Sequence, residues 1–275
     1  MKSISWLGVA GLKIETDDGW ILFDPYLSRH TKFETFFKPI LPKARLVEGF
    51  LNNHQSIAAI FVSHTHSDHA ADIPKFAQLS SAKICGSKSL GIILKTFGVA
   101  KNFLNVEDNP AISGNGWKVT AIKSKHGKAL LGKEPFPGEI TKFPKKPRVV
   151  RYRTGQTFNF LVEIEGLKIL HLGSAELIEA NLSSALEKPA DIAFFCVPGW
   201  DKEEALKRFL KTAKPKVVIP FHYDDFSSEL NQENIKTIPG IDLALFTSAV
   251  KKLAPETKLL KIKPLEVTTI SKLIG

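Results

Sequence analysis

Cysteine is scarce in this chain of 275 residues, which contains two, Cys85 and Cys196. Each lies in an apolar run, so we expect buried free thiols and neither a disulfide nor a thiolate metal ligand. No stretch approaches the roughly 18 uncharged apolar residues of a membrane-spanning helix. The first residues also lack the apolar core and the cleavage site of a signal peptide. These absences argue against a disulfide scaffold and a transmembrane segment, and favour the cytoplasm.

Internal repeats and low-complexity tracts are also lacking. With 43% hydrophobic and 24% charged residues, the chain has enough apolar side chains for one sizeable core. No shift in composition marks a boundary between two units, so we expect a single domain over residues 1–275. A basic, proline-rich insert is expected within it at about 127–157.

Acidic residues are sparse in the segment 123–153, where ten lysines and arginines stand against two glutamates. The segment therefore carries most of the net charge of +10. One interpretation is a solvated basic loop. The other is a positive field that draws an anionic substrate toward a nearby site, with Lys145, Lys146 and Arg148 as candidate substrate-binding residues.

Apolar periodicity and turn residues predict an α/β fold in which helices follow strands. Strands are expected at 4–6, 12–14, 20–23, 58–63, 84–85, 117–122, 158–165, 168–172, 192–197 and 217–220. Helices are expected at 72–79, 88–97 and 176–186, and from a cap at Asp201 to about 213. The aromatic and basic segment 29–50 is interpreted as a long loop or lid with a helical turn.

Three histidines and an aspartate fall within six positions, directly after the predicted strand 58–63. Neutral imidazole is the commonest protein ligand of zinc and similar metals. A strand end that leads into a loop can turn His64 and His66 toward one ion. Asp68 and His69, at the start of the next helix, then point toward a neighbouring position.

Five further histidines are available to complete such a site. His126 and His222 each follow a predicted strand, as the cluster does, and are therefore the candidates. His30 and His54 are expected at the surface. His171 lies within a strand pattern and is expected to be a hydrogen-bonded core residue.

The chain resembles the metallo-β-lactamase superfamily over nearly its whole length. The resemblance lies in Phe-Asp-Pro at 23–25, in the His-x-His-x-Asp-His cluster, in the lone His126 and in Pro-Phe-His-Tyr at 220–223. The opening Trp-Leu-Gly-Val-Ala-Gly at 6–11 is most similar to the branch with ascorbate-lactonase-like and N-acyl-phosphatidylethanolamine phospholipase-D-like hydrolases. The resemblance implies a four-layer αβ/βα sandwich.

The same resemblance implies two metal sites. The first consists of His64, His66 and His126, and the second of Asp68, His69 and His222. Asp24 is implied as the group that orients the ligands through hydrogen bonds.

One position departs from the family pattern. The family has a strand ending in Gly-Asp, whose carboxylate bridges two metals, whereas here Ser174 follows Gly173. A neutral hydroxyl is a poor bridge between two dications. We therefore expect one tightly bound metal and a second that is weaker or absent, with Glu176 as an alternative ligand.

The predicted activity is hydrolysis by a metal-bound hydroxide of a small anionic ester, lactone or phosphodiester. Zinc is the expected metal, with Mn²⁺ or Fe²⁺ as alternatives. Asp68 is predicted as general base when the second site is empty, with His222 as acid or polarising group. Tyr223 is a candidate oxyanion donor or, equally, a structural residue.

Two alternative functions are a nuclease of the same fold and a non-catalytic metal-binding protein. The charge of +10 supports the nuclease. The chain is short for an added nucleic-acid clamp, and the basic insert has few interleaved aromatics, so nucleic acid is not the expected partner. The oligomeric state stays open.

Overall fold

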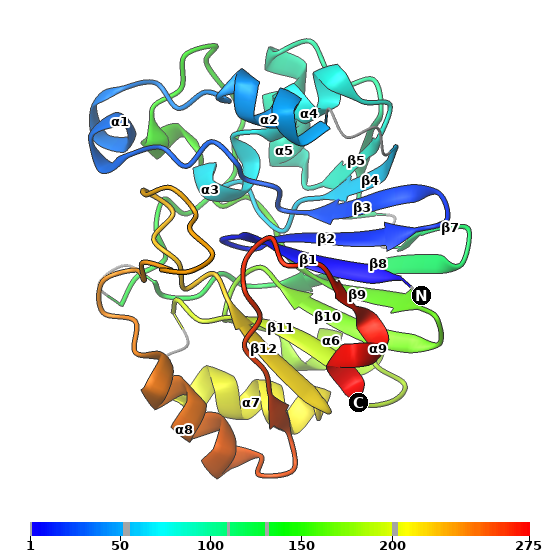
Figure 1. The fold of residues 1–275 in the computed structure, drawn as a ribbon. Coiled ribbons are helices and arrows are strands. Elements are labelled where there is room, and N and C mark those ends of the chain that lie inside the picture. Colours follow the sequence, from blue (N-terminus) through cyan, green and yellow to red (C-terminus); the bar gives the residue numbers. More distant parts are fainter. Residues whose placement is uncertain (1, 52–55, 109–110, 130–131, 200–202) are drawn as a thin grey trace.

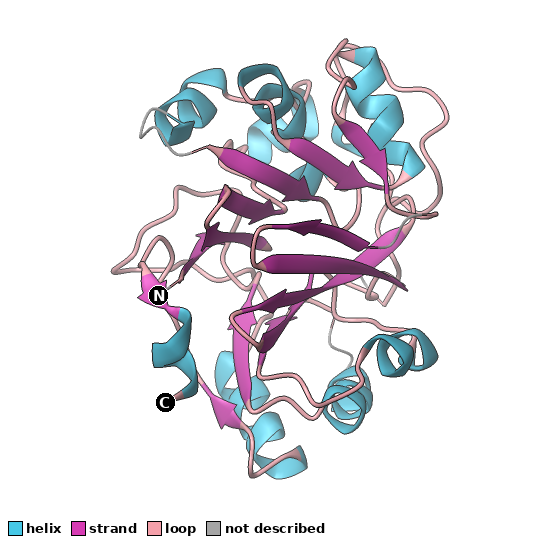
Figure 2. Cartoon of the chain, turned by 90° about the vertical axis from the view of Figure 1, so that its right-hand side faces the viewer, coloured by secondary structure: helices cyan, strands magenta, loops and turns pink. Residues whose placement is uncertain are grey.

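Two seven-stranded sheets pack face to face in the computed structural model, which describes residues 2–51, 56–108, 111–129, 132–199 and 203–275. Helices cover the outer face of each sheet, as the ribbon in Figure 1 and the turned view in Figure 2 show. The predicted α/β, four-layer αβ/βα sandwich is therefore confirmed. Within the described residues, no helix is long and apolar enough to cross a membrane.

The first sheet is built mainly from the first half of the chain. Its order is β14 (Thr268–Thr269), β1 (Ser3–Gly8), β2 (Gly11–Thr16), β3 (Gly19–Phe23), β4 (Ile57–Phe61), β5 (Lys83–Gly86) and β6 (Phe103–Asn105). The helices on its side are α1 (Lys32–Phe37), α2 (Ala44–Leu51), α3 (Ser67–Ala70), α4 (Ile73–Leu79) and α5 (Lys88–Thr96).

The second sheet follows in the chain. Its order is β13 (Lys258–Leu259), β12 (Val217–Phe221), β11 (Ile192–Cys196), β10 (Leu167–Leu172), β9 (Thr157–Ile164), β8 (Trp117–Ser124) and β7 (Ala111–Gly114). It is covered by α6 (Glu179–Ala185), α7 (Glu204–Ala213) and α8 (Leu243–Leu253), and a short α9 (Ile270–Ile274) follows β14.

The direction of the strands brings the loops that carry the candidate site residues to the same end of the two sheets. In the first sheet β3, β4 and β5 are parallel, and in the second β10, β11 and β12 are parallel. β8 points the same way as β10 because both pair antiparallel with β9. The loops after β3, β4, β8, β10 and β12 therefore leave each sheet at one common edge.

Aromatic side chains from both sheets fill the space between them. Phe23 on β3 stacks on Phe61 of β4 at 5.2 Å between ring centroids. It also meets Phe160 of β9, in the facing sheet, at 5.6 Å. All three are buried, and burial of each such side chain stabilises the fold by about 2–3 kcal/mol. The sheets are thereby held in a fixed relation, so the loops at their common edge are positioned rigidly.

The segment 29–50 was predicted as a loop with one helical turn, and that prediction is incomplete. It forms two helices, α1 and α2. At the start of α1 the Thr31 hydroxyl accepts from the Glu34 N–H, and the Glu34 carboxylate accepts from the Thr31 N–H. This reciprocal capping stabilises the helix, although its sequence is short and rich in aromatic residues.

The structure also has elements that the periodicity did not indicate. These are the short strands β6, β7, β13 and β14 and the helices α8 and α9. Asp242 caps α8 by accepting from the N–H groups of Ala244 and Leu245. The predicted cap at Asp201 lies outside the described residues, and α7 begins at Glu204.

Candidate metal centre

The histidine cluster follows β4 directly, as predicted. His66 occupies the cap position of α3, so His64 and His66 lie on the loop while Asp68 and His69 lie in the first turn. His126 follows β8, and His222 follows β12 with a left-handed backbone (φ 63°). The common edge of the two sheets therefore collects ligands from three loops.

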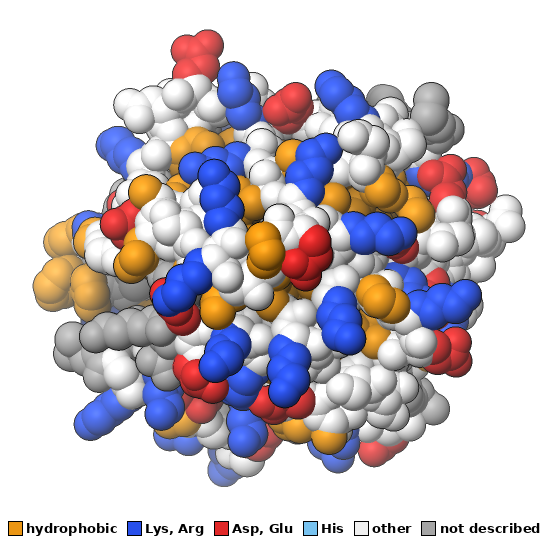
Figure 3. Space-filling model, turned by 90° about the horizontal axis from the view of Figure 1, so that it is seen from below, with side chains coloured by type: hydrophobic (Ala, Val, Ile, Leu, Met, Phe, Trp, Pro, Cys, Tyr) orange, Lys and Arg blue, Asp and Glu red, His pale blue; other side chains and the backbone are white. Residues whose placement is uncertain are grey.

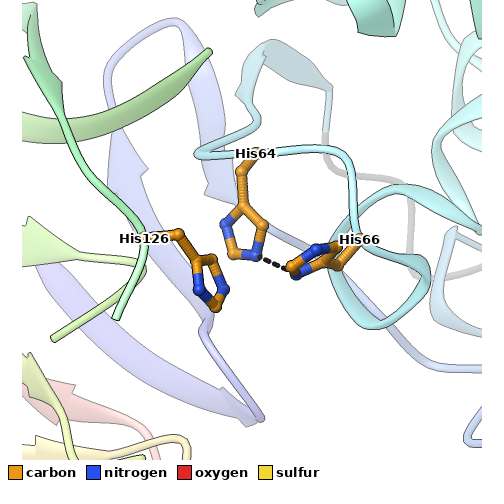
Figure 4. Close-up of side chains that lie close together, drawn as sticks. All are labelled: His64, His66 and His126. Atoms are coloured by element: carbon orange, nitrogen blue, oxygen red, sulfur yellow. Dashed lines mark hydrogen bonds between the residues drawn. The ribbon is translucent and has the colours of Figure 1, made fainter. Parts of the chain in front are cut away.

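His64, His66 and His126 form one group, whose ligand nitrogens all lie within 4.8 Å of one another. Their rings converge on one region of space from separate segments of chain (Figure 4). The ring centroids are 4.6–4.7 Å apart in each pair. His64 and His66 are buried and His126 is partly exposed. One side of the group is therefore accessible from the solvent.

Hydrogen bonds on the outer side of each ring fix which nitrogen is free. His126 donates from Nδ1 to the carbonyl of Gly127 (2.7 Å), and His66 donates from Nε2 to the carbonyl of Pro135 (2.8 Å). Ser63 donates its hydroxyl proton to Asp24, so its oxygen accepts from His64 Nδ1 (3.0 Å). The lone pairs of His64 Nε2, His66 Nδ1 and His126 Nε2 are left facing inward.

This donor set fits a metal ion. His64 Nε2 and His66 Nδ1 are 3.0 Å apart, although both carry lone pairs. Two nitrogens bound to a tetrahedral zinc are separated by roughly 3.3 Å, so a shared cation resolves the contact. Burial lowers the pKa of His66 to about 4 and that of His126 to about 3, and it holds the pKa of His64 well below its usual value. The imidazoles are thus neutral at pH 7, as metal ligands must be.

Asp68, His69 and His222 form a second group with ligand atoms within 4.8 Å. The Asp68 carboxylate lies 3.6 Å from His69 Nε2 and 3.4 Å from His222 Nε2, and the two Nε2 atoms are 3.2 Å apart. Burial alone raises the pKa of Asp68, but His69 and His222 outweigh it and hold that pKa below its usual value. Asp68 is therefore an anion that faces both histidines. The His64 and His69 rings are 3.8 Å apart, so the two groups are adjacent.

Asp24 ties both groups to the end of β3. It is fully buried with a left-handed backbone (φ 41°), and it accepts from the N–H (2.7 Å) and the hydroxyl (2.5 Å) of Ser63. It also contacts His69 Nδ1 at 2.9 Å, which leaves His69 Nε2 for the second group. Asp24 therefore contacts His69 directly and is linked to His64 through Ser63.

Ser174 has a structural partner of its own. Its hydroxyl oxygen accepts from the N–H of Gly127 (2.8 Å), next to His126, and its side chain is buried at the cavity wall. Glu176, the alternative ligand, instead pairs with Arg208 (2.6 Å) and accepts from the Leu177 N–H. Because Glu176 makes these other contacts, it does not replace the missing bridging carboxylate.

A cavity of about 630 Å³ opens beside both groups. Its polar end contains the six candidate ligands and Ser174. The remaining wall is mostly apolar, from Tyr26, Phe36, Ile40, Phe136, Phe226 and Ile238. Among the described lining residues, Lys32 is the one lysine or arginine. The aromatic wall was not predicted from the sequence, although the phenylalanines of the segment 29–50 were a signal for it.

The other candidate substrate-binding residues do not line this cavity. Lys145, Lys146 and Arg148 are exposed and absent from its lining, and Arg148 donates to the Phe36 carbonyl. Tyr223 is 4% exposed and packs on Trp6 at 5.1 Å, which matches the structural interpretation of this residue. Burial raises its pKa to about 12.

The remaining histidines divide into one confirmed and one incorrect prediction. His171 lies in the core and donates from Nε2 to the carbonyl of Ala10 (2.7 Å), as expected. His30 was expected at the surface but is 5% exposed, with hydrogen bonds to Tyr26 and to the carbonyl of Leu41. The residue pattern did not indicate these hydrogen bonds. His54 lies outside the described residues.

A buried ion pair of Arg29 and Asp224, which was not predicted from the sequence, lies next to the site. Arg29 Nη2 lies 2.8 Å from the Asp224 carboxylate, and the same carboxylate accepts from the Val9 N–H. Arg29 also donates to the carbonyls of Asp225 and Ser228. These contacts hold the loop that carries His222.

The two cysteines are buried and free, as predicted.

Comparison with known proteins agrees with this geometry. The β-lactamase superfamily domain matches residues 19–223, which is most of the chain, so the chain belongs to the metallo-β-lactamase superfamily. A UPF0173 metal-dependent hydrolase from Polynucleobacter asymbioticus is 28% identical over 253 residues, covering 85% of this chain and 82% of that protein. A relative with the same description from Cupriavidus necator is 26% identical and covers 80% and 73%.

Solved structures show the same fold at low identity. A metallo hydrolase from the archaeon Ignicoccus hospitalis superposes with a TM-score of 0.64 at 16% identity, covering 98% of both chains. An isothiocyanate hydrolase from Delia radicum gut bacteria superposes with a TM-score of 0.61 at 15% identity, covering 98% of this chain and 99% of that one.

Proposed function

We propose that the protein is a metal-dependent hydrolase that uses zinc, with Mn²⁺ or Fe²⁺ as alternatives, at His64, His66 and His126. The observation that carries the proposal is the set of three inward-facing lone pairs on one wall of a cavity. The relatives from Polynucleobacter and Cupriavidus, described as metal-dependent hydrolases, support it. Zinc in such a site supplies a nucleophilic water at neutral pH and stabilises developing negative charge.

The residues of the second group have distinct roles in this proposal. Asp68 is an anion that contacts His222 and can take the proton of the attacking water. His222 faces the cavity and can donate a proton to the leaving group. Asp24 holds His69 and, through Ser63, His64, so these ligand positions are fixed before substrate binds. Asp68, His69 and His222 would hold a second metal, and Asp68 would then be a ligand and not the base.

The proposed substrate is a small ester, lactone or phosphodiester with an apolar body. The cavity places its polar groups at one end and aromatic and aliphatic side chains along the rest, which suits a molecule with one hydrolysable group. Lys32, the one lysine or arginine among the described lining residues, supports an anionic group on such a substrate, and so does the basic insert, whose described cations lie outside the lining. The apolar wall disfavours a nucleic-acid strand, whose phosphates need several cations along the groove.

A substrate panel with the purified metal-loaded protein tests this proposal. It comprises aryl esters, acyl lactones, bis-p-nitrophenyl phosphate and an aryl isothiocyanate, the last because a protein of the same fold is named for that activity. Turnover of one class that is lost in Asp68→Asn with metal content unchanged supports the assigned base. If metal-loaded protein turns over none of them, the non-catalytic alternative is favoured.

A further inference from the structure

Helix α1 exposes an unusual amount of aromatic surface. Phe33, Phe36 and Phe37 are 62–66% exposed, and the helix has no buried residue. The rings of Phe33 and Phe37 pack on each other at 5.2 Å between centroids, so they form one apolar surface. Large apolar side chains clustered in this way on a surface mark an interaction site.

Basic residues lie at both ends of α1 and on the segment of the insert that contacts it. Lys32 and Lys38 lie at the two ends of α1, and Lys38 Nζ lies 5.8 Å from the centre of the Phe33 ring. The insert brings further cations, because Arg148 donates to the Phe36 carbonyl and Pro147 accepts from the Ile40 N–H at 2.7 Å. Exposed Lys145 and Lys146 precede this contact in the chain. The α1 patch comprises Phe33, Phe36, Phe37, Lys32, Lys38, Lys145, Lys146 and Arg148.

The α1 patch carries five cations, and one of them, Lys32, is close enough to Asp225 to lower the pKa of that carboxylate. The acidic residue of helix α1, Glu34, is not part of the patch and pairs with Lys43 at 3.0 Å. Among the described residues, no carboxylate forms an ion pair with any of the five cations of the patch. By contrast, the face seen from below in Figure 3 carries basic and acidic side chains interspersed. The patch is thus an apolar centre with a rim of one charge sign.

We propose that the α1 patch docks the protein on an anionic lipid surface. Phenylalanines insert at the boundary between headgroups and acyl chains, while the surrounding lysines and arginine meet the lipid phosphates. α1 protrudes at the periphery of the molecule, outside the layers of the sandwich, so it can reach a flat surface (Figure 1).

A second copy of the chain suits the α1 patch less well. A twofold interface places the same patch on both subunits, so the five cations would face their own equivalents. A lipid phosphate surface is complementary in both charge and apolar character. Lys32 and Phe36 also line the cavity, so the proposed membrane face borders the entrance to the metal centre. An amphiphilic substrate could then enter without crossing bulk water.

Cosedimentation with vesicles tests this surface without any measurement of hydrolysis. The wild type should bind vesicles of phosphatidylcholine with phosphatidylglycerol and bind phosphatidylcholine alone much more weakly. Phe33→Ser with Phe37→Ser, which spares the cavity residue Phe36, should weaken binding on the order of tenfold or more. Lys145→Ser with Lys146→Ser should weaken it on the order of tenfold at low salt and less as salt rises.

Leu245→Ser is the matched control, since Leu245 is 53% exposed on α8, far from α1 in Figure 1. It should bind anionic vesicles as the wild type does. Thermal unfolding of each variant verifies that it folds. Three results overturn the proposal: no binding by the wild type, unchanged binding by the phenylalanine variant, or conversion of a wild-type dimer to a monomer by that variant without vesicle binding. None of these results bears on the metal centre.

Discussion

Ser174→Asp should create a second metal site of much higher affinity. Ser174 lies buried at the cavity wall beside the two ligand groups. These groups are adjacent, since the His64 and His69 rings are 3.8 Å apart, so two cations would repel each other strongly. Two unit charges 4 Å apart interact by about 4 kcal/mol at an effective dielectric of 20. After the desolvation of the new carboxylate, we expect a net gain of ~3 kcal/mol, about a hundredfold in affinity.

Competition with a chromophoric chelator measures this change. The wild type should release one zinc ion at low chelator concentration and hold a second tightly, whereas Ser174→Asp should hold both. Ser174→Asn is the matched control, because it has nearly the same shape and can still accept from the Gly127 N–H without adding charge. Two equally tight ions in the wild type, or equal gains in the Asn and Asp variants, would refute the reasoning.

Three further predictions concern protonation and charge. Burial raises the pKa of Asp72 to about 6 from 3.8, so the folded state retains a proton that the unfolded chain releases. The free energy of unfolding should therefore fall by roughly 3 kcal/mol as pH rises from 3.8 to about 6. Urea unfolding at a series of pH values measures this change, and in Asp72→Asn the free energy of unfolding should depend less on pH. Burial raises the pKa of Cys85 to about 12 and that of Cys196 well above its usual value, so at about pH 8 a thiol reagent should label neither until the protein unfolds. Replacing Lys145 and Lys146 by Ser should raise KM for an anionic substrate at low salt only, because both lie outside the cavity; a salt-independent rise would contradict their placement.

The residues of the candidate centre could be found from the sequence because their chemistry is local. His64 and His66 are two positions apart at the end of an apolar strand, and His126 and His222 follow strands of the same kind. A β/α alternation places such strand ends at one edge. The candidate ligands could therefore be chosen without knowledge of the distances between them.

The walls of the cavity could not be found in this way. Phe136 and Phe226 reach the site through loops whose path depends on tertiary contacts, such as the hydrogen bond from Thr154 to the Phe136 carbonyl. His30 was expected at the surface because it lies in an irregular loop, yet it is buried and forms hydrogen bonds to Tyr26 and Leu41. Pairs such as Arg29 and Asp224, 195 residues apart, leave no periodic pattern.

The proposed metal site is tested by measuring metal content per chain together with hydrolysis. The proteins compared are the wild type, His64→Ala, His126→Ala and His54→Ala. His54, predicted at the surface from the sequence, is the control. We expect at least one tightly bound metal and turnover in the wild type and the control, and loss of both in the other two variants, because a three-ligand site does not tolerate the loss of one. Full metal content with undiminished turnover in His64→Ala or His126→Ala would contradict it.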